Sequence, residues 1–369
     1  MRLVRVGLKN RAYPIYIGAS LIQQAGALLK KAGLGPRHVL IVSQKQVAVY
    51  YEKPLRESLS AAGFDSSIFL TPASKSSEAS KTQLVWSRLI RELARQDGKN
   101  RALAVLALGG GVIGDLAGFA AAVYRRGIPY VQVPTTLTAQ VDSAIGGKTA
   151  IDLPEGKNLL GTIYQPAAVL ADTSALSSLP ERHWNDGFAE VIKYGVIKDP
   201  ALFRLLEKKG LDGVRRDARC LENVITRCAE IKAEVVAADE LDRSGLRIIL
   251  NFGHTAGHGI EAAAGYSGHY THGEAVAVGM LVACDISEKM GVCKDRELGA
   301  RLEKILIKFG LPTYTKGIST EAVLKAMGYD KKSLNQANRF VLPVQLGKTA
   351  VVSDIPNAVI LEALEKRKR

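Results

Sequence analysis

Residues 103–119, LAVLALGGGVIGDLAGF, decide the fold of this chain, because an apolar run passes directly into closely spaced glycines. The short apolar run at 103–108 is typical of a buried parallel strand. Gly109, Gly111 and Gly114 follow in GxGxxG register, at the start of a predicted helix. Such a strand, turn and helix bring backbone N–H groups and a helix amino terminus against a pyrophosphate. The stretch therefore predicts a dinucleotide site, and a turn needed only for close packing is the alternative.

The usual acidic partner of this turn is missing. About 20 residues after the glycines, a carboxylate normally binds the ribose hydroxyls, but here the next predicted strand ends in Pro134, Thr135 and Thr136. If the site binds NAD, it does so through a variant of the usual arrangement.

On either side of the turn, the chain alternates apolar runs with an amphipathic segment. The runs at 38–43 and 128–134 favour buried strands, while Val85, Leu89 and Leu93 repeat at helical spacing within 82–96. This alternation predicts a Rossmann-like nucleotide-binding domain over residues 1–184. From residue 185 the pattern changes to long segments rich in Ala, Leu, Glu and Lys, which predict a mostly helical metal- and substrate-binding domain over 185–369. The expected class is thus α/β plus all-α.

Between these patterns, residues 134–166 are rich in Gly, Thr and Pro, too rich in turn formers for one regular element. Asp142, Lys148, Lys157 and Asn158 lie among its glycines. So many polar groups in one long connection favour a functional loop that cradles an anion.

Composition excludes several classes of protein. With 47% hydrophobic and 23% charged residues, the chain can bury sizeable cores, and no apolar run is long enough for a membrane span. We expect a soluble, unexported protein with four reduced cysteines, since none of them forms a CxxC pair. The net charge of +14 fits anionic small molecules; because the basic residues are scattered, we expect no nucleic-acid partner.

Four of the six histidines, His254, His258, His269 and His272, fall within 19 residues. Imidazoles with a carboxylate suit a catalytic zinc ion that keeps an open position. His254 and His258 are four apart and share a helical face, but the glutamate of an HExxH motif is absent, so spacing alone leaves open which histidine binds metal. We expect His269 to be a packing residue.

Glu190 and Lys193 are three apart and lie on one face of another predicted helix. Their neighbours are apolar, so a functional pair competes with a simple exposed ion pair as the interpretation.

Six segments resemble successive motifs of the 3-dehydroquinate synthase family, in order and with similar spacing: GGGVIGD (109–115), RRGIPYVQVPTTLTAQVDSAIGGKTAID (125–152), EGKNLLGTIYQP (155–166), GFAEVIKYG (187–195), LRIILNFGHTAGHGIE (246–261) and HGEAVAVGM (272–280). The resemblance implies a cytoplasmic, commonly homodimeric enzyme of the shikimate pathway that uses NAD and zinc or cobalt. It also implies an anionic sugar-acid phosphate as substrate, with phosphate elimination and ring closure as the reaction.

The resemblance also implies roles for individual residues. The metal ligands would be Glu190, His254 and His272, and His258 would contact substrate. The other substrate residues implied are Arg126, Asp142, Lys148, Lys157, Asn158, Lys193, Lys232, Arg247 and Asn251, with Lys331 or Lys332 closing on them. The NAD residues implied are Glu78, Lys81, Gly109, Gly110, Gly111, Val112, Ile113, Gly114, Asp115, Thr135, Thr136, Asp142, Ser143, Lys148, Lys157 and Ser178.

Two departures concern the nucleotide periphery: Ser43-Gln44 and His183-Trp184 stand where the family commonly has Asp or Asn and an acidic residue. They bear on adenosine contacts. Two alternatives remain: a sister cyclase that forms an inosose, a valiolone or an aminodehydroquinate, and a metal-dependent polyol dehydrogenase. Lys157 with Asn158, and Asn251 with His258, favour the dehydroquinate type.

Overall fold

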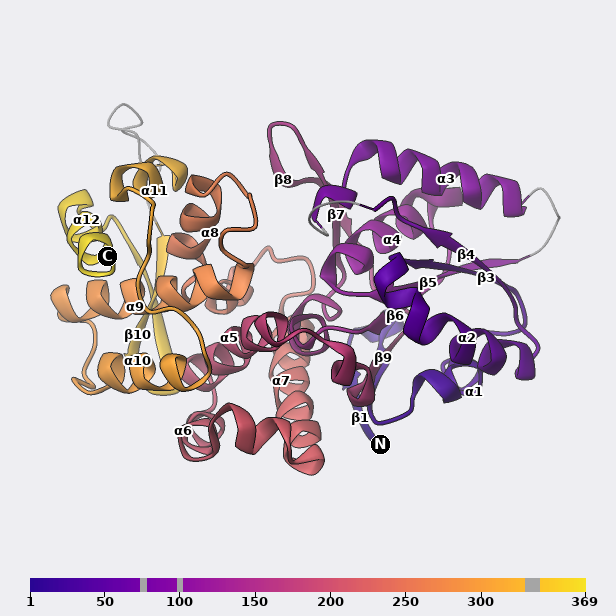
Figure 1. Cartoon of the computed structure of the whole chain (residues 1–369), viewed down its shortest axis with the longest axis horizontal. Coiled ribbons are helices and arrows are strands. Elements are labelled where there is room, and N and C mark those ends of the chain that lie inside the picture. The colour runs from indigo at the N-terminus through magenta and orange to yellow at the C-terminus, as the bar shows by residue number, and fades with distance from the viewer. Residues whose placement is uncertain (74–77, 98–101, 329–338) are drawn as a thin grey trace. The chain divides into compact units, whose positions relative to one another are not determined.

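The computed structural model describes residues 1–73, 78–97, 102–328 and 339–369 (Figure 1). The chain divides into two compact units. The first consists of residues 1–180 and 225–241, and the second of residues 181–224 and 242–369.

The first unit is built on one seven-stranded sheet with the order β1-β2-β9-β6-β5-β3-β4. Its strands are β1 (Arg2–Val6), β2 (Tyr13–Gly18), β3 (His38–Ser43), β4 (Asp65–Leu70), β5 (Leu103–Gly109), β6 (Tyr130–Pro134) and β9 (Ala168–Asp172). All neighbouring strands run parallel except β1, which pairs antiparallel with β2. Its α-helices before residue 180 are α1 (Ala25–Lys31), α2 (Lys45–Ala61), α3 (Gln83–Asp97) and α4 (Gly111–Val123).

Helices cover both faces of this sheet. Val39 and Ile41 of β3 face a core that includes Leu55 and Leu59 of α2. The intervening Leu40 and Val42 face the opposite core with α3 and α4. Because parallel strands buried on both faces need apolar side chains at successive positions, the β3 run HVLIVS has no polar alternation. The predicted Rossmann-like architecture is confirmed.

The Gly- and Thr-rich stretch after β6 forms short elements. Ala139–Ser143 is a π-helical turn, and β7 (Lys148–Leu153) pairs antiparallel with β8 (Gly156–Ile163) in a separate hairpin. Gly146 and Gly147 have φ values of 100° and 72° directly before β7, which glycine adopts without steric cost. The expected loop therefore contains a hairpin that carries Lys148, Lys157 and Asn158.

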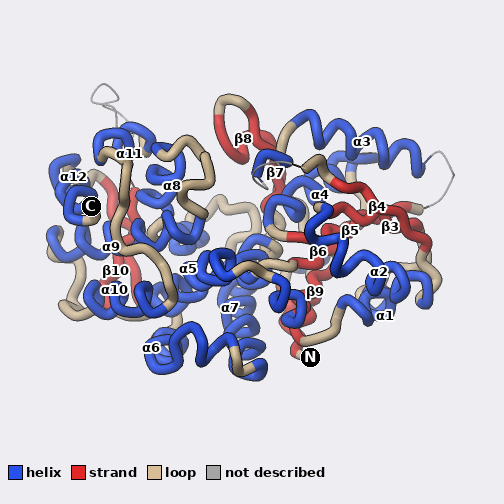
Figure 2. The backbone as a smooth tube through the Cα atoms, viewed as in Figure 1, coloured by secondary structure: helices blue, strands red, loops and turns tan. Residues whose placement is uncertain are grey.

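The second unit is mostly helical (Figure 2). Its helices are α5 (Glu181–Ile197), α6 (Pro200–Arg215), α8 (His254–Ala263), α9 (His272–Lys289), α10 (Leu298–Lys308), α11 (Thr320–Ala326) and α12 (Asn357–Lys366). The buried helix α9 lies at its centre and is contacted by α5, α8, α10 and α12. One antiparallel hairpin, β10 (Arg339–Gln345) with β11 (Lys348–Ser353), completes the unit.

Helix α7 (Ala218–Ala238) belongs to both units, since its residues from Ile225 onward group with the first. The contacts of this segment explain the grouping. Lys232 donates to the backbone carbonyl of Asp142 at 2.7 Å, and Arg11 pairs with Glu240 just beyond the helix at 2.8 Å. The first unit thus includes a piece of the chain that was expected in the helical domain.

All four cysteines are free thiols, as expected. Among the described residues, no helix combines the length and apolar character that crossing a membrane requires.

Candidate active site

In the first unit, the glycine-rich turn lies between β5 and α4 at the carboxyl end of the sheet. Gly110 is the N-cap of α4, and no side chain of the described residues caps this terminus. A Cβ at Gly111 would lie 2.8 Å from Ser143 Oγ, and one at Gly110 would lie 3.0 Å from Thr136 Cγ2. The glycines therefore let α4 begin close against Ser143 and Thr136, and a helix amino terminus of this kind favours an anion.

Gly114 has a packing role as well. A Cβ there would meet the Gln132 side chain of β6 at 2.7 Å, so the helix approaches the sheet closely only because this residue is glycine. The N–H of Thr135 donates to the carbonyl of Gly109 at 3.0 Å, which holds the ends of β5 and β6 together. Thr135, Thr136 and Ser143, three of the residues implied for NAD, thus lie at the turn.

Lys81 is the centre of a buried charge network beside this turn. Its side chain is 4% exposed and donates to Asp115 Oδ2 at 2.6 Å and to the side-chain carbonyl of Asn158. Glu78 lies 3.8 Å from Lys81 and 3.9 Å from Lys157. Burial alone would lower the pKa of Lys81, but Asp115 and Glu78 outweigh it and raise the pKa, so the ammonium stays charged. The structure brings together five predicted site residues from α4, the β7–β8 hairpin and the segment before α3.

Asp142 and Lys232 form a second pair in this unit. Their side chains make an ion pair, and Lys232 is 8% exposed. Ser178 accepts or donates a hydrogen bond with Tyr51 Oη at 2.6 Å.

Arg126 lies apart from the turn. Arg126 lies beyond the carboxyl end of α4, whereas the turn lies at its amino end. The length of the helix, about 20 Å, therefore separates them. Arg125 and Arg126 have φ values of 49° and 64°, a left-handed conformation that is rare for arginine. Lys331 and Lys332 lie outside the described residues.

In the second unit, three helices bring Glu190, His254 and His272 into one cluster. Glu190 Oε1 lies 3.5 Å from His254 Nε2 and 3.4 Å from His272 Nε2. The ligand atoms of the three residues all lie within 4.8 Å of one another. Glu190 is fully buried, where its carboxylate pairs with the Lys193 ammonium and faces both imidazoles. A buried carboxylate facing two imidazole nitrogens fits a divalent cation.

The protonation equilibria fit the same conclusion. Burial and the nearby Lys193 ammonium lower the pKa of His254 to about 3, so its imidazole is neutral. Burial alone would raise the pKa of Glu190, but Lys193 and His254 hold it well below its usual range. Burial would lower the pKa of His272, but Glu190 and Glu261 outweigh burial and raise it. The neutral His254 imidazole and the ionised Glu190 carboxylate are forms that bind a cation, and the carboxylates beside His272 would favour replacement of its proton by a cation.

Lys193 forms an ion pair with Glu190, and the side chains are 1% and 0% exposed. The pair is therefore buried, which disfavours the interpretation as an exposed surface pair. His258 is exposed and belongs to a different grouping, with Glu261 and His272. The spacing of His254 and His258 could not separate these roles, because the deciding neighbour, Glu190, comes from another helix.

Several residues that hold the cluster carry no signal in the spacing. His254 Nδ1 lies 3.2 Å from the Phe252 carbonyl, and His272 Nδ1 lies 3.0 Å from Glu261 Oε2. Asp186 Oδ1 accepts from the N–H of Gly273 at 2.6 Å, which ties the start of α9 to α5. Only Glu261, seven residues after His254 on the same helical face, could have been suspected from the sequence.

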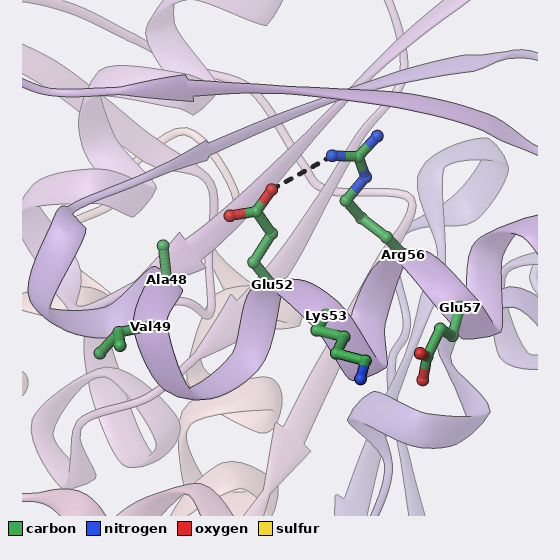
Figure 3. A pocket seen from close by; sticks show the side chains of 6 residues that line it. All are labelled: Ala48, Val49, Glu52, Lys53, Arg56 and Glu57. Carbon is green, nitrogen blue, oxygen red and sulfur yellow. Dashed lines mark hydrogen bonds and ion pairs between the residues drawn. The ribbon is translucent and has the colours of Figure 1, made fainter.

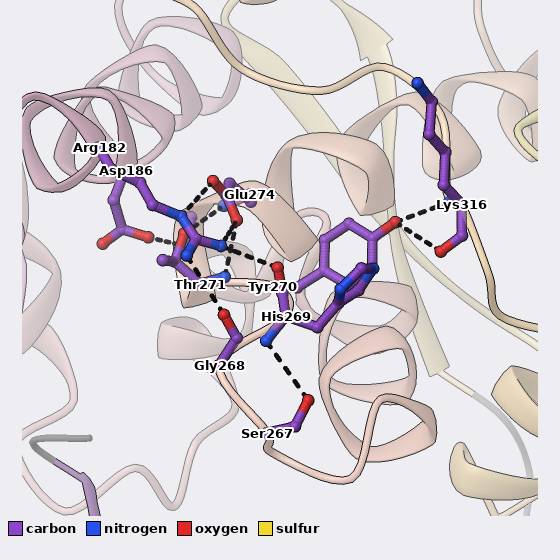
Figure 4. A network of polar contacts seen from close by, with 10 residues as sticks. Arg182, Asp186, Ser267, Gly268, His269, Tyr270, Thr271, Glu274 and Lys316 are labelled. Carbon is purple, nitrogen blue, oxygen red and sulfur yellow. Dashed lines mark hydrogen bonds and ion pairs between the residues drawn. The ribbon is translucent and has the colours of Figure 1, made fainter. Parts of the chain in front are cut away.

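The start of α9 is also held by a polar network (Figure 4). Thr271 and Glu274 form a capping box, and Arg182 of α5 binds both Glu274 oxygens at 2.8 and 2.7 Å. Arg182 also donates to the carbonyls of Gly268 and His269. The exposed His269 ring lies edge-on to the neighbouring Tyr270. The network fixes the helix end from which His272 projects.

Arg247 and Asn251 lie in the short helical segment Leu246–Asn251 that precedes His254, with Arg247 buried and Asn251 exposed. A separate surface hollow lies along α2 and contains the Arg56–Glu52 pair at 3.2 Å (Figure 3). None of its lining residues was predicted for the site.

Solved structures place this architecture among the sugar phosphate cyclases. The chain is 26% identical to a 2-deoxy-scyllo-inosose synthase complexed with carbaglucose-6-phosphate, NAD+ and Co2+, with a TM-score of 0.85 over 99% of this chain and 100% of that one. It is 28% identical to 2-epi-5-epi-valiolone synthase from Streptomyces hygroscopicus subsp. jinggangensis 5008 with NAD+ and Zn2+ bound, with a TM-score of 0.84 over 99% of both chains. Fold and site thus define a sugar phosphate cyclase.

Within that class, sequence comparison is more specific. Residues 72–186 match the family model 3-dehydroquinate synthase N-terminal, and residues 187–333 match 3-dehydroquinate synthase C-terminal. The 3-dehydroquinate synthase of Desulforamulus reducens is 44% identical over 367 residues, which cover 99% of this chain and all of that protein. The chain belongs to the 3-dehydroquinate synthase family. The sister-cyclase alternative is not favoured, since those relatives are 26% and 28% identical.

Proposed function

We propose that the chain converts 3-deoxy-D-arabino-heptulosonate 7-phosphate to 3-dehydroquinate and phosphate, with NAD and a divalent metal ion as cofactors. The observation that carries this proposal is the Glu190–His254–His272 cluster in a chain of this family. The glycine turn at the amino terminus of α4 supports NAD. Two imidazoles and one carboxylate are typical zinc ligands, so we propose zinc, with cobalt as a substitute.

When bound, the metal ion would lower the pKa of a substrate hydroxyl, and NAD would accept a hydride from that carbon and return it later. The proposed sequence is oxidation, phosphate elimination, reduction, ring opening and intramolecular aldol closure. Because the hydride returns to the substrate, no NADH should accumulate.

The residues of the chain have separate tasks in this proposal. Glu190, His254 and His272 hold the metal ion, and Lys193 keeps Glu190 ionised. Lys148, Asn158, Asn251 and His258 would hold the substrate phosphate, which itself would take the proton released in the elimination step.

The remaining cationic residues would recognise the carboxylate and hydroxyl groups of an anionic substrate. Ammonium and guanidinium groups bind such anions through charge-assisted hydrogen bonds. Lys232 would be one of these anion-binding residues, since Asp142 positions its ammonium beside the π-helical turn. We extend the proposal to a cytoplasmic homodimer, supported by the family resemblance alone; sedimentation velocity and fractionation would test it.

The test is phosphate release from the heptulosonate phosphate by metal-loaded protein with catalytic NAD. We expect release that stops after chelation and in Glu190→Ala, with dehydroquinate formed and no net NADH. Glu207→Gln, which removes the charge of Glu207 from its ion pair with Arg301 at 2.7 Å in the same unit, is the matched control and should keep the activity. No release by protein that binds both cofactors would refute the assignment.

A further inference from the structure

Glu261 is a buried carboxylate that the proposed reaction does not use. It lies on α8 three residues after His258 and seven after His254, so all three share one helical face. The residue is 8% exposed, and its Oε2 lies 3.0 Å from His272 Nδ1. A carboxylate buried to this degree is costly unless it is paired, which indicates that the contact with His272 has a task.

We propose that Glu261 is a positioning residue that fixes the ring of His272 so that Nε2 faces the metal cluster. This inference rests on the metal site of the proposed function, but not on the substrate or the reaction.

The two ring nitrogens of His272 have different neighbours. Nε2 lies 3.4 Å from Glu190 Oε1, while Nδ1 faces Glu261. When Glu261 accepts a hydrogen bond from Nδ1–H, the metal-binding form of the ring keeps its hydrogen on Nδ1 and offers the Nε2 lone pair to a cation. Metal-binding histidines usually donate their second ring nitrogen in this way, which orients the ring and makes the ligand more basic.

His254 follows the same arrangement with a neutral partner. Its Nδ1 lies 3.2 Å from the carbonyl of Phe252, and its Nε2 points to Glu190. The two histidines are thus held by unlike acceptors, a backbone carbonyl for His254 and a carboxylate for His272. Changing residue 261 alters one of them and leaves the other intact.

Close packing of α8 on α9 brings Glu261 within reach. A Cβ at Gly257 would lie 3.0 Å from Val276 Cα, and one at Gly279 would lie 2.1 Å from the Gly253 carbonyl oxygen. Because the two backbones lie this close, the Glu261 side chain is long enough to extend from α8 to His272, the first residue of α9.

A competing interpretation makes Glu261 a ligand. His258, Glu261 and His272 also group within 4.8 Å, and a second ion there would use His272 Nδ1. That ion would have to replace the hydrogen bond to Glu261, so the two interpretations differ in the number of ions bound and in the metal-bound nitrogen.

The experiment compares Glu261→Ala, Glu261→Gln and the control Glu207→Gln in the full chain. Zinc dissociation constants come from chelator competition, and coordination comes from the visible spectrum of the cobalt-loaded protein. We expect Glu261→Ala to weaken zinc binding by about 10- to 100-fold and to change the cobalt spectrum. Glu261→Gln keeps an acceptor oxygen without the charge, so its loss should be smaller. Glu207→Gln should match the wild type in both.

The proposal would be overturned if Glu261→Ala had the same zinc affinity and cobalt spectrum as the wild type. It would also be overturned if the wild-type chain bound two zinc ions and this variant bound one. If Glu261→Ala does not fold, judged by circular dichroism of the metal-free protein, the isosteric Gln variant and histidine ¹⁵N spectra of the zinc-loaded wild type decide. These spectra should show His272 bound through Nε2; binding through Nδ1 would refute the inference. Tight zinc binding without phosphate release would refute the proposed function and leave this inference standing.

Discussion

Gly279→Ala should destabilise the second unit, although alanine is the better helix former. A Cβ at residue 279 would lie 2.1 Å from the carbonyl oxygen of Gly253 and 2.7 Å from the nitrogen of Gly257. Carbon and carbonyl oxygen approach no closer than roughly 3.3 Å even in favourable contacts, so α8 and α9 must separate by about 1 Å. The obstacle is backbone, which cannot rotate away.

The magnitude follows from two opposing terms. Overpacking costs about 1–3 kcal/mol, and the backbone obstacle favours the upper value. The helix propensity of alanine over glycine offsets about 1 kcal/mol. The net loss of about 2 kcal/mol corresponds to a fall in Tm of roughly 4–8 °C for a unit of this size. Because His254 and His272 project from the two separating helices, zinc affinity should fall as well.

Thermal denaturation by circular dichroism and chelator competition measure these effects. The matched control is Gly299→Ala in α10, where the nearest atom to the new Cβ is Cys284 Cβ at 3.8 Å. This substitution should leave Tm unchanged or raise it, by up to about 1 kcal/mol of stability. A Gly279→Ala protein as stable as the wild type, with unchanged zinc affinity, would refute the close-packing argument.

Three further substitutions or modifications test other parts of the structure. Arg182→Met removes the ion pair to Glu274 and should cost about 1 kcal/mol, read as a small fall in Tm; no change would show that the network does not hold α9. Gly111→Ala places a methyl group 2.8 Å from Ser143 Oγ and should weaken NAD binding by roughly 5- to 150-fold in calorimetry, the equivalent of about 1–3 kcal/mol; unchanged affinity would remove the turn from the nucleotide site. Burial raises the pKa of the Cys284 thiol, so native protein should leave it unmodified by a disulfide reagent at neutral pH, with reaction expected only at alkaline pH or after unfolding; rapid labelling of Cys284, checked by mass spectrometry, would contradict its burial.

The sequence predicted those parts of the structure that local patterns determine. The strand, glycine turn and helix at 103–119 are contiguous, so their apolar runs and glycine spacing suffice to predict them. Spacing could not predict that His254 and His258 have different roles, because their roles depend on where α5 places Glu190. The β10–β11 hairpin was not foreseen, since its two short strands lie in a helix-rich context and pair around Gly347 with φ 84°.

Tertiary contacts also decided the extent of the units. Nothing in the composition of α7 changes at residue 225, and the segment belongs to the first unit because of distant partners such as Asp142 and Arg11. In the same way, the contact between Glu261 and His272 depends on glycines in two helices that only the folded chain brings together.

The shared helix α7 has a consequence for gene recombination. A crossover at residue 180 would exchange the nucleotide-binding half for that of a relative. Asp142 and Arg11 would then come from one parent, and their partners Lys232 and Glu240, which are encoded downstream of the crossover, from the other. The two units are therefore not interchangeable cassettes. A chimera that retains both pairs must carry residues 225–241 from the same parent as residues 1–180, so the two segments are expected to be inherited together.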